Sequence, residues 1–147
     1  MNTTRAQVRR LIISRNHWGE MLNDVQSKTP EEACGLVAGK RVANTFHSTS
    51  IIPVINELHS PFRYRMYPRQ QLAAFKQIDL NGWELAAIYH SHPLGPDQPS
   101  PTDIAEAHYP DTITLIWSKQ PGDWHCHAFR ILEGHIDEIE IQLLDDK

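Results

Sequence analysis

The chain has 147 residues, a length typical of one domain with its own hydrophobic core. Its 14 lysines and arginines against 18 acidic residues give a formal net charge of -4, which argues against a nucleic-acid or anionic-membrane surface. The two cysteines, Cys34 and Cys126, are too few for a secreted disulfide framework, and no segment approaches the roughly 20 apolar residues of a membrane span. We therefore expect one cytoplasmic domain over residues 1–147, with no nucleic-acid or membrane partner.

In chain order, hydrophobic spacing predicts a helix over residues 15–27, strands over 33–38, 41–50 and 51–58, a helix over 68–80, a strand over 83–92, a short helix over 100–108, and strands over 112–117, 124–132 and 135–143. Ser14 is placed to cap the first helix, and Gly39-Lys40 is typical of a turn. Pro53 weakens its strand, and residues 133–134 join the last two strands as a hairpin. This irregular mixture indicates an α+β fold, a curved mixed β-sheet flanked by helices.

Two histidines at the polar end of the strand over 83–92 are candidate metal ligands. Alternate side chains of a strand point the same way, so His90 and His92 face one side together. The loop that follows is long enough to fold back and bring Asp103 beside them. Two neutral nitrogens and one carboxylate leave Zn²⁺ an open fourth position, which is typical of catalytic sites. A further carboxylate is needed to take a proton from water, and Glu32 is the candidate.

The spacing of these residues resembles a metallopeptidase motif. The segment from His90 to Asp103 reproduces without a departure the HxHx7SxxD motif of the JAMM/MPN+ (JAB-type) zinc metallopeptidases. The segment over 30–39, PEEACGLVAG, resembles the block in that family where a glutamate precedes an apolar strand ending in glycine. The resemblance therefore implies a prokaryotic-type single-domain member with a cytidine-deaminase-like sheet arrangement.

The resemblance also implies a role for each matching residue. These roles are Zn²⁺ ligation by His90, His92 and Asp103, general acid/base catalysis by Glu32, and stabilisation of the oxyanion by Ser100. Glu31 is a weaker choice of base, because the family position aligns with its neighbour. A mononuclear iron site fits the same three ligands, but oxygenase chemistry would leave the glutamate without a role.

Several of these residue types also have ordinary structural interpretations. Ser100 fits a helix N-cap, a role that is compatible with catalysis. His125 and His127 repeat the HxH spacing, but no carboxylate follows them at a recurring spacing, so we expect structural histidines there. Cys34 and Cys126 are expected to be small buried residues and not nucleophiles, because nothing places a basic partner beside either.

The family resemblance implies hydrolysis of a peptide or isopeptide bond after the Gly-Gly tail of a ubiquitin-like or sulfur-carrier protein. An extended tail can pair with a strand edge near the metal, and we expect residues 56–66 and the loop over 93–99 to form the walls of its channel. Two alternatives are a metal-dependent peptide hydrolase of a cell-wall or phage-tail system and a non-catalytic MPN-type scaffold. The complete ligand set argues against the scaffold. The identity of the carrier, the leaving group and the formation of a homodimer stay open.

Overall fold

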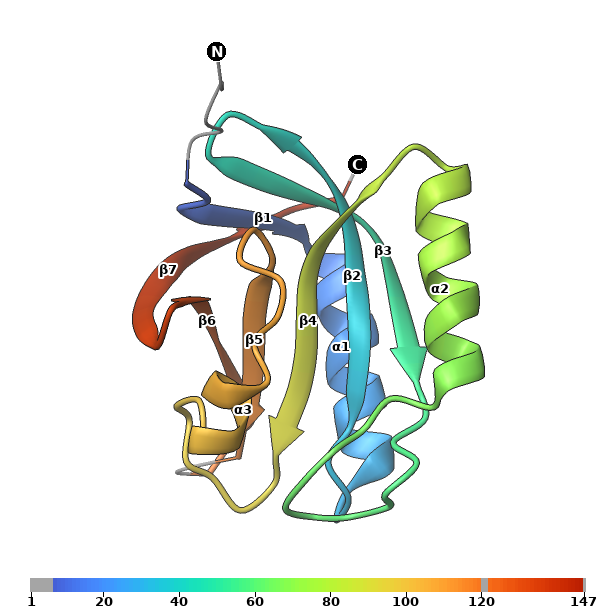
Figure 1. Ribbon diagram of the computed structural model, residues 1–147, viewed down its shortest axis with the longest axis vertical. Coiled ribbons are helices and arrows are strands. Elements are labelled where there is room, and N and C mark those ends of the chain that lie inside the picture. The colour runs from blue at the N-terminus through green and yellow to red at the C-terminus, as the bar shows by residue number, and fades with distance from the viewer. Residues whose placement is uncertain (1–6, 120–121, 147) are drawn as a thin grey trace.

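The computed structural model describes residues 7–119 and 122–146, which form a curved mixed sheet with three helices (Figure 1). The elements in chain order are β1 (Arg10–Ser14), α1 (Arg15–Lys28), β2 (Cys34–Val42), β3 (Thr45–Val54), α2 (Pro68–Leu80), β4 (Glu84–His92), α3 (Pro101–Ala105), β5 (Ile113–Ser118), β6 (His125–Leu132) and β7 (His135–Leu144). The strand order is β1-β3-β2-β4-β5-β6-β7, and pairing of β1 with β7 closes the sheet. The α+β prediction is confirmed. No helix in the described part of the chain is long and apolar enough to cross a membrane.

The two longer helices lie on opposite faces of the sheet (Figure 1). Met21 of α1 belongs to a buried cluster to which every strand contributes at least one apolar side chain, including Val37 of β2. Ile78 of α2 belongs to a second buried cluster that includes Leu36 of β2. Because neighbouring residues of a strand point to opposite faces, these two clusters lie on the two sides of the same sheet.

The pairing of β2 with β4 sets the position of the candidate site. The two strands are antiparallel, and Cys34 lies opposite His90. Glu32 precedes Cys34 by two residues, and His92 follows His90 by two. Because the strands are antiparallel, Glu32 and His92 lie at the same end of this strand pair. Side chains two residues apart share a face, and residues opposite each other do so as well. The register therefore directs all of these side chains to the face that α2 covers.

The turn predicted at Gly39-Lys40 is wrong, because β2 continues to Val42. A Cβ atom added at Gly39 would lie 2.7 Å from the carbonyl oxygen of His47 and 2.9 Å from Cβ of Ala86. The register between β2 and β3 also shifts at this glycine. Gly39 therefore allows a close approach of neighbouring strands at a bulge, and the turn comes later in the chain.

In place of the two strands predicted over 41–50 and 51–58 there is one strand, β3 (Thr45–Val54), which contains Pro53, and residues 41 and 42 belong to β2. On one side Pro53 lies opposite Gly35 of β2. On the other side, β1 pairs with β3 only between Thr45 and His47. Within the described residues Pro53 thus lies on an edge segment, which is the part of a sheet that tolerates proline.

Other local predictions agree with the structure more closely. Ser14 caps α1, and its hydroxyl accepts a hydrogen bond from the backbone N–H of His17. The hairpin of β6 and β7 turns at Glu133 and Gly134, which both have positive φ, as a two-residue type I′ turn requires. The third helix is shorter than the predicted range over 100–108, because it ends at Ala105.

Candidate metal centre and active site

Three side chains converge at the C-terminal end of β4. Nε2 of His90 lies 3.0 Å from Nε2 of His92 and 3.2 Å from Oδ2 of Asp103. Nε2 of His92 lies 3.3 Å from the same carboxylate oxygen. Ligand atoms placed tetrahedrally around zinc at its usual bond lengths lie about 3.3 Å from one another. The structure therefore brings the three predicted ligands together at a spacing that fits one small cation.

Hydrogen bonding prepares His92 to bind a cation. Its Nδ1 atom lies 2.7 Å from the carbonyl oxygen of Pro96. A carbonyl oxygen only accepts, so Nδ1 carries the hydrogen, and in the neutral ring Nε2 has a free lone pair directed at His90 and Asp103. A backbone acceptor that fixes the tautomer in this way is typical of metal-binding histidines.

The surroundings shift the pKa of each of the three residues. Burial lowers the pKa of His90, which keeps this imidazole neutral. Burial alone would raise the pKa of Asp103, but hydrogen bonds to His90 and His92 hold it well below its usual range. Burial also opposes protonation of His92, yet the bonds to Asp103 and the Pro96 carbonyl leave its pKa raised. A proton and a cation therefore compete for His92.

A capping box positions the carboxylate of Asp103. The backbone N–H of Ser100 donates to Oδ2 of Asp103 at 2.8 Å, and the backbone N–H of Asp103 donates to Oγ of Ser100 at 3.0 Å. Ser100 is thus the N-cap of α3, as its structural interpretation predicts. Because its oxygen only accepts in this bond, its own hydroxyl hydrogen stays available to a substrate.

Glu32 lies beside the two histidines, with a carboxylate oxygen within 4.8 Å of a ring nitrogen of each. The backbone N–H of Ala33 donates to Oγ of Ser91 at 2.8 Å, and that of Ser91 donates to the carbonyl oxygen of Ala33 at 3.1 Å. Ser91, which lies between the two histidines in the sequence, thereby holds the segment that carries Glu32. Burial raises the pKa of Glu32 to about 7, although His92 opposes the shift. A carboxyl group with this pKa can accept and return a proton near neutral pH.

Asn56 is a structural residue of the site that the sequence pattern does not single out. It is 6% exposed, and its amide nitrogen donates to the carbonyl oxygens of Glu32 and Arg63. Its amide oxygen accepts from the backbone N–H groups of Leu58 and Arg65. These four bonds fix the loop after β3 against the glutamate segment. A lone asparagine in a polar stretch carries no sequence signal for this role.

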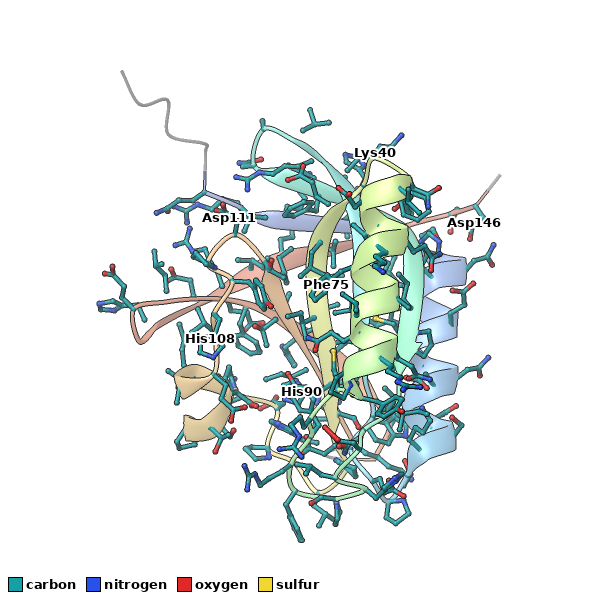
Figure 2. The ribbon with its side chains drawn as sticks, turned by 45° about the vertical axis from the view of Figure 1, so that its right-hand side comes forward. Lys40, Phe75, His90, His108, Asp111 and Asp146 are labelled. Atoms are coloured by element: carbon teal, nitrogen blue, oxygen red, sulfur yellow. The ribbon has the colours of Figure 1, made fainter. Side chains whose placement is uncertain are left out.

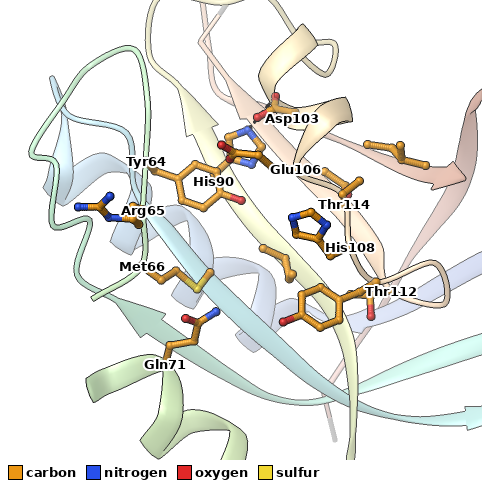
Figure 3. A pocket seen from close by; sticks show the side chains of 14 residues that line it. Tyr64, Arg65, Met66, Gln71, His90, Asp103, Glu106, His108, Thr112 and Thr114 are labelled. Carbon is orange, nitrogen blue, oxygen red and sulfur yellow. Dashed lines mark hydrogen bonds and ion pairs between the residues drawn. The ribbon is translucent and has the colours of Figure 1, made fainter. Parts of the chain in front are cut away.

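Tyr64 is a second residue missed at the sequence level. Its ring stacks on His90 with 4.7 Å between ring centroids and 27° between ring planes. Figure 3 shows this ring beside His90, with Asp103 and Glu106 close by and His108 farther along the same cleft. The contact spans a loop and a strand, so no short spacing in the sequence could reveal it.

Two clefts meet at the candidate site. One has a volume of ≈ 440 Å³ and continues past Met66 towards His108, and the other, of ≈ 340 Å³, contains Glu32 and Ser100. Segments 56–66 and 93–99, the predicted channel walls, both line the smaller cleft. Figure 2 places His90 at the end of β4, below α2. A substrate could therefore extend away from the site in two directions.

The expected burial of the two cysteines holds for Cys34, whereas Cys126 is only partly buried. Cys34 is buried, and burial raises the pKa of its thiol to about 12. Cys126 packs against the main core cluster, and burial raises its pKa well above the usual value. Because the thiolate is the nucleophilic form, neither cysteine is prepared for nucleophilic catalysis.

Structural histidines are predicted at His125 and His127 because no carboxylate follows them at a recurring spacing, but a carboxylate from an earlier segment lies beside them. Asp97, in the loop between β4 and α3, approaches both rings, and the three residues form a group that could hold a metal ion. The carboxylate precedes the histidines in the sequence by more than twenty-five positions. Inspection of the residues that follow the pair could not have found it.

Comparisons with known proteins agree with this geometry. Residues 14–132 match the model of the family described as prokaryotic homologs of the JAB domain. The chain is 27% identical over 136 residues to the "CysO-cysteine peptidase" of Mycobacterium tuberculosis, covering 92% of each chain. It is 34% identical over 113 residues to the "Desampylase" of Haloferax volcanii, covering 74% of this chain and 80% of that one. It is 42% identical over 100 residues to the "Probable TtuB-protein conjugate cleaving protease" of Thermus thermophilus, covering 67% of this chain and 64% of that one.

A solved structure supports the same relationship. The solution structure of a protein from Desulfitobacterium hafniense matches with a TM-score of 0.83 and 34% identity, covering 92% of this chain and 94% of that one. The family match spans most of the chain and contains all of the residues gathered at the end of β4. The predicted JAMM resemblance is therefore confirmed, and the chain belongs to the family of prokaryotic homologs of the JAB domain.

Proposed function

We propose that this protein is a zinc-dependent peptidase or isopeptidase that hydrolyses the bond after the Gly-Gly tail of a ubiquitin-like or sulfur-carrier protein. The observation that carries this proposal is the convergence of two imidazole nitrogens and one carboxylate oxygen within 3.3 Å of one another. His90, His92 and Asp103 would hold the ion, with Glu32 beside it. Two nitrogens and one oxygen leave a coordination position for water or substrate.

A bound zinc ion would polarise the scissile carbonyl group and make a water molecule more acidic. Glu32 takes the proton of the attacking water and delivers it to the leaving amine. A bound cation would favour the ionised form of Glu32, which is the form that accepts a proton. Ser100 donates its hydroxyl hydrogen to the negative charge that develops on the carbonyl oxygen. The capping box keeps this serine at the edge of the smaller cleft.

The proposed substrate class follows from the relatives and the shape of the site. The three named relatives are a CysO-cysteine peptidase, a desampylase and a TtuB-conjugate cleaving protease. Two clefts that meet at the candidate site suit a bond between two chains, with the tail in one cleft and the leaving group in the other. We place this reaction in the cytoplasm and assign it to a single domain over residues 1–147.

The proposal is tested with the zinc-loaded protein and a linear fusion of a ubiquitin-like carrier, ending in Gly-Gly, to a reporter peptide. Wild type is expected to release the reporter, and a chelator to abolish release. Glu32→Gln is expected to lower the rate by about 100-fold to 10,000-fold, because it removes the proton acceptor. Glu31→Gln is the matched control, since its side chain is more exposed and pairs with His59. This control should retain the wild-type rate.

Ser100 needs a test that separates helix capping from catalysis. Ser100→Ala removes both the cap and the donor, whereas Ser100→Thr keeps both functions. We expect a loss of about 100-fold to 1,000-fold for the alanine variant and recovery of most activity with threonine.

Equal cleavage by wild type and Glu32→Gln would remove Glu32 as the base. Cleavage of cell-wall peptides, with the carrier fusion left intact, would replace the proposed substrate class.

A further inference from the structure

We propose that Asp97, His125 and His127 form a second site, for a divalent transition-metal ion of the zinc class, which ties the loop over 93–99 to β6. The two histidines are two residues apart on β6 and share a face of that strand. Asp97 comes from the loop between β4 and α3, which also carries Pro96 beside the candidate active site.

The donor atoms are close enough for one ion. Oδ2 of Asp97 lies 3.5 Å from Nε2 of His127 and 3.9 Å from Nε2 of His125. All three residues offer ligand atoms within 4.8 Å of one another. The two imidazole rings are nearly perpendicular, at 89°, with centroids 5.5 Å apart. A movement of the loop by roughly half an ångström would bring the carboxylate to the spacing of about 3.3 Å found around zinc.

The second nitrogen of each ring has an acceptor that fixes the tautomer. Nδ1 of His127 lies 2.9 Å from Oε2 of Glu138. Nδ1 of His125 lies 3.2 Å from the carbonyl oxygen of Asp123. Both acceptors require a hydrogen on Nδ1, so in the neutral rings both Nε2 lone pairs face the Asp97 carboxylate. Lone pairs directed at an anion repel it unless a proton or a metal cation lies between them.

This arrangement repeats the one at the candidate active site. His92 also bonds through Nδ1 to a backbone acceptor and directs Nε2 at an aspartate. Carboxylate and carbonyl partners of this kind orient metal-binding histidines and raise their basicity. Two nitrogens and one oxygen favour zinc, cobalt or nickel over magnesium and calcium, which prefer oxygen ligands.

The second site is open to solvent. The side chains of His125, His127 and Asp97 are 33%, 32% and 41% exposed. An ion can therefore enter without any opening of the core, and water can complete its coordination. Such exposure also predicts weaker binding than at the buried cluster around His90, which is 1% exposed. The two sites should therefore fill in sequence as zinc is added.

The loop links the two sites. Asp97 follows Pro96 directly, and the carbonyl of Pro96 accepts the hydrogen bond of His92. An ion that holds Asp97 against β6 therefore restricts the residue that orients His92. We expect the second equivalent of zinc to slow amide hydrogen exchange in the loop over 93–99.

The test is a calorimetric titration of the metal-free full-length chain with Zn²⁺ alone. Wild type is expected to bind two ions, and Asp97→Asn and His127→Asn to bind one. Glu138→Gln should weaken the second site by about 10-fold to 100-fold, because the glutamate is a positioning residue outside the ligand set. His135→Asn, which replaces an exposed histidine on β7, is the matched control and should retain both sites.

A variant at the other cluster separates this inference from the proposed function. His92→Asn should lose the tighter site and keep the weaker one. The second site would be overturned if wild type bound one ion and if Asp97→Asn and His127→Asn left that binding unchanged. This result would indicate that the two histidines pair with Asp97 through protons only. One ion that disappears in Asp97→Asn and persists in His92→Asn would support the second site and contradict the proposed catalytic one. Loop exchange that does not respond to the second equivalent would overturn the link.

Discussion

Replacement of Glu32 by glutamine should stabilise the metal-free protein while it removes activity. Glu32 is 5% exposed, and its burial raises the pKa to about 7 from a usual value of 4.5. The folded state therefore resists ionisation of this side chain, whereas the unfolded chain does not. Glutamine has the same shape and no charge, so it avoids the cost of ionising a buried carboxyl group.

The magnitude follows from the two pKa values. Below pH 4.5 the carboxyl group is protonated in both states, and its contribution to stability is fully present. As the pH rises to about 7, the unfolded chain ionises first, so unfolding releases a proton and the free energy of unfolding falls. A shift of this size corresponds to about 3 kcal/mol above neutral pH, at 1.36 kcal/mol for each pH unit. Wild type carries this penalty and Glu32→Gln does not.

The assay is urea unfolding of both proteins, with a chelator, at about pH 5 and about pH 8.5. The advantage of the variant should grow by about 2 to 3 kcal/mol between these conditions. Glu31→Gln should show no comparable change, and zinc should reduce the advantage of Glu32→Gln, because a nearby dication favours the ionised carboxylate. A difference between wild type and Glu32→Gln that is the same at both pH values would refute the reasoning.

Three other substitutions test the supporting structure. Asn56→Ala should lower the free energy of unfolding in urea by about 2 to 4 kcal/mol, because one buried and three partly buried hydrogen bonds are lost. An unchanged midpoint would contradict that role. Gly35→Ala should lower the thermal midpoint, because the added Cβ atom would lie 2.3 Å from the ring of Tyr89. Overpacking of this kind costs about 1 to 3 kcal/mol, and calorimetry measures the shift in the midpoint. Tyr64→Leu should weaken zinc binding at His90 by several-fold to about 10-fold, whereas Tyr64→Phe keeps the stacked ring and the affinity. Equal affinities of the two variants would exclude the stack as the cause.

The arrangement around His90 could be predicted because it depends on short spacings. A period of two places both histidines on one face, and the loop up to Ser100 has room to return the aspartate to them. The capping box signature also lies within four residues, from Ser100 to Asp103. Local rules of strand and helix geometry are therefore sufficient to predict that these candidate ligands lie together and to place the ends of most elements.

The supporting contacts could not be predicted in this way, because they join segments that are distant in the chain. The bond from Asn56 to the Glu32 carbonyl depends on the path of the loop after β3. The approach of Asp97 to His127 depends on the parallel pairing of β4 with β5 and the antiparallel return of β6. Gly39 was misassigned for the same reason. Glycine signals a turn and a close approach of strands equally well, and only the neighbouring strands decide between them.

The capping box explains how one short segment can serve both folding and the proposed metal binding. A side chain that must bind an ion loses rotamer entropy when it is fixed, which weakens binding. In this protein Asp103 is already fixed, because its carboxylate accepts the backbone N–H of Ser100 and its own N–H donates back to the serine. The ordering cost is therefore met when the chain folds, before an ion arrives. His92 is held in the same way by the Pro96 carbonyl, so two of the three proposed ligands are oriented by backbone groups of a single loop.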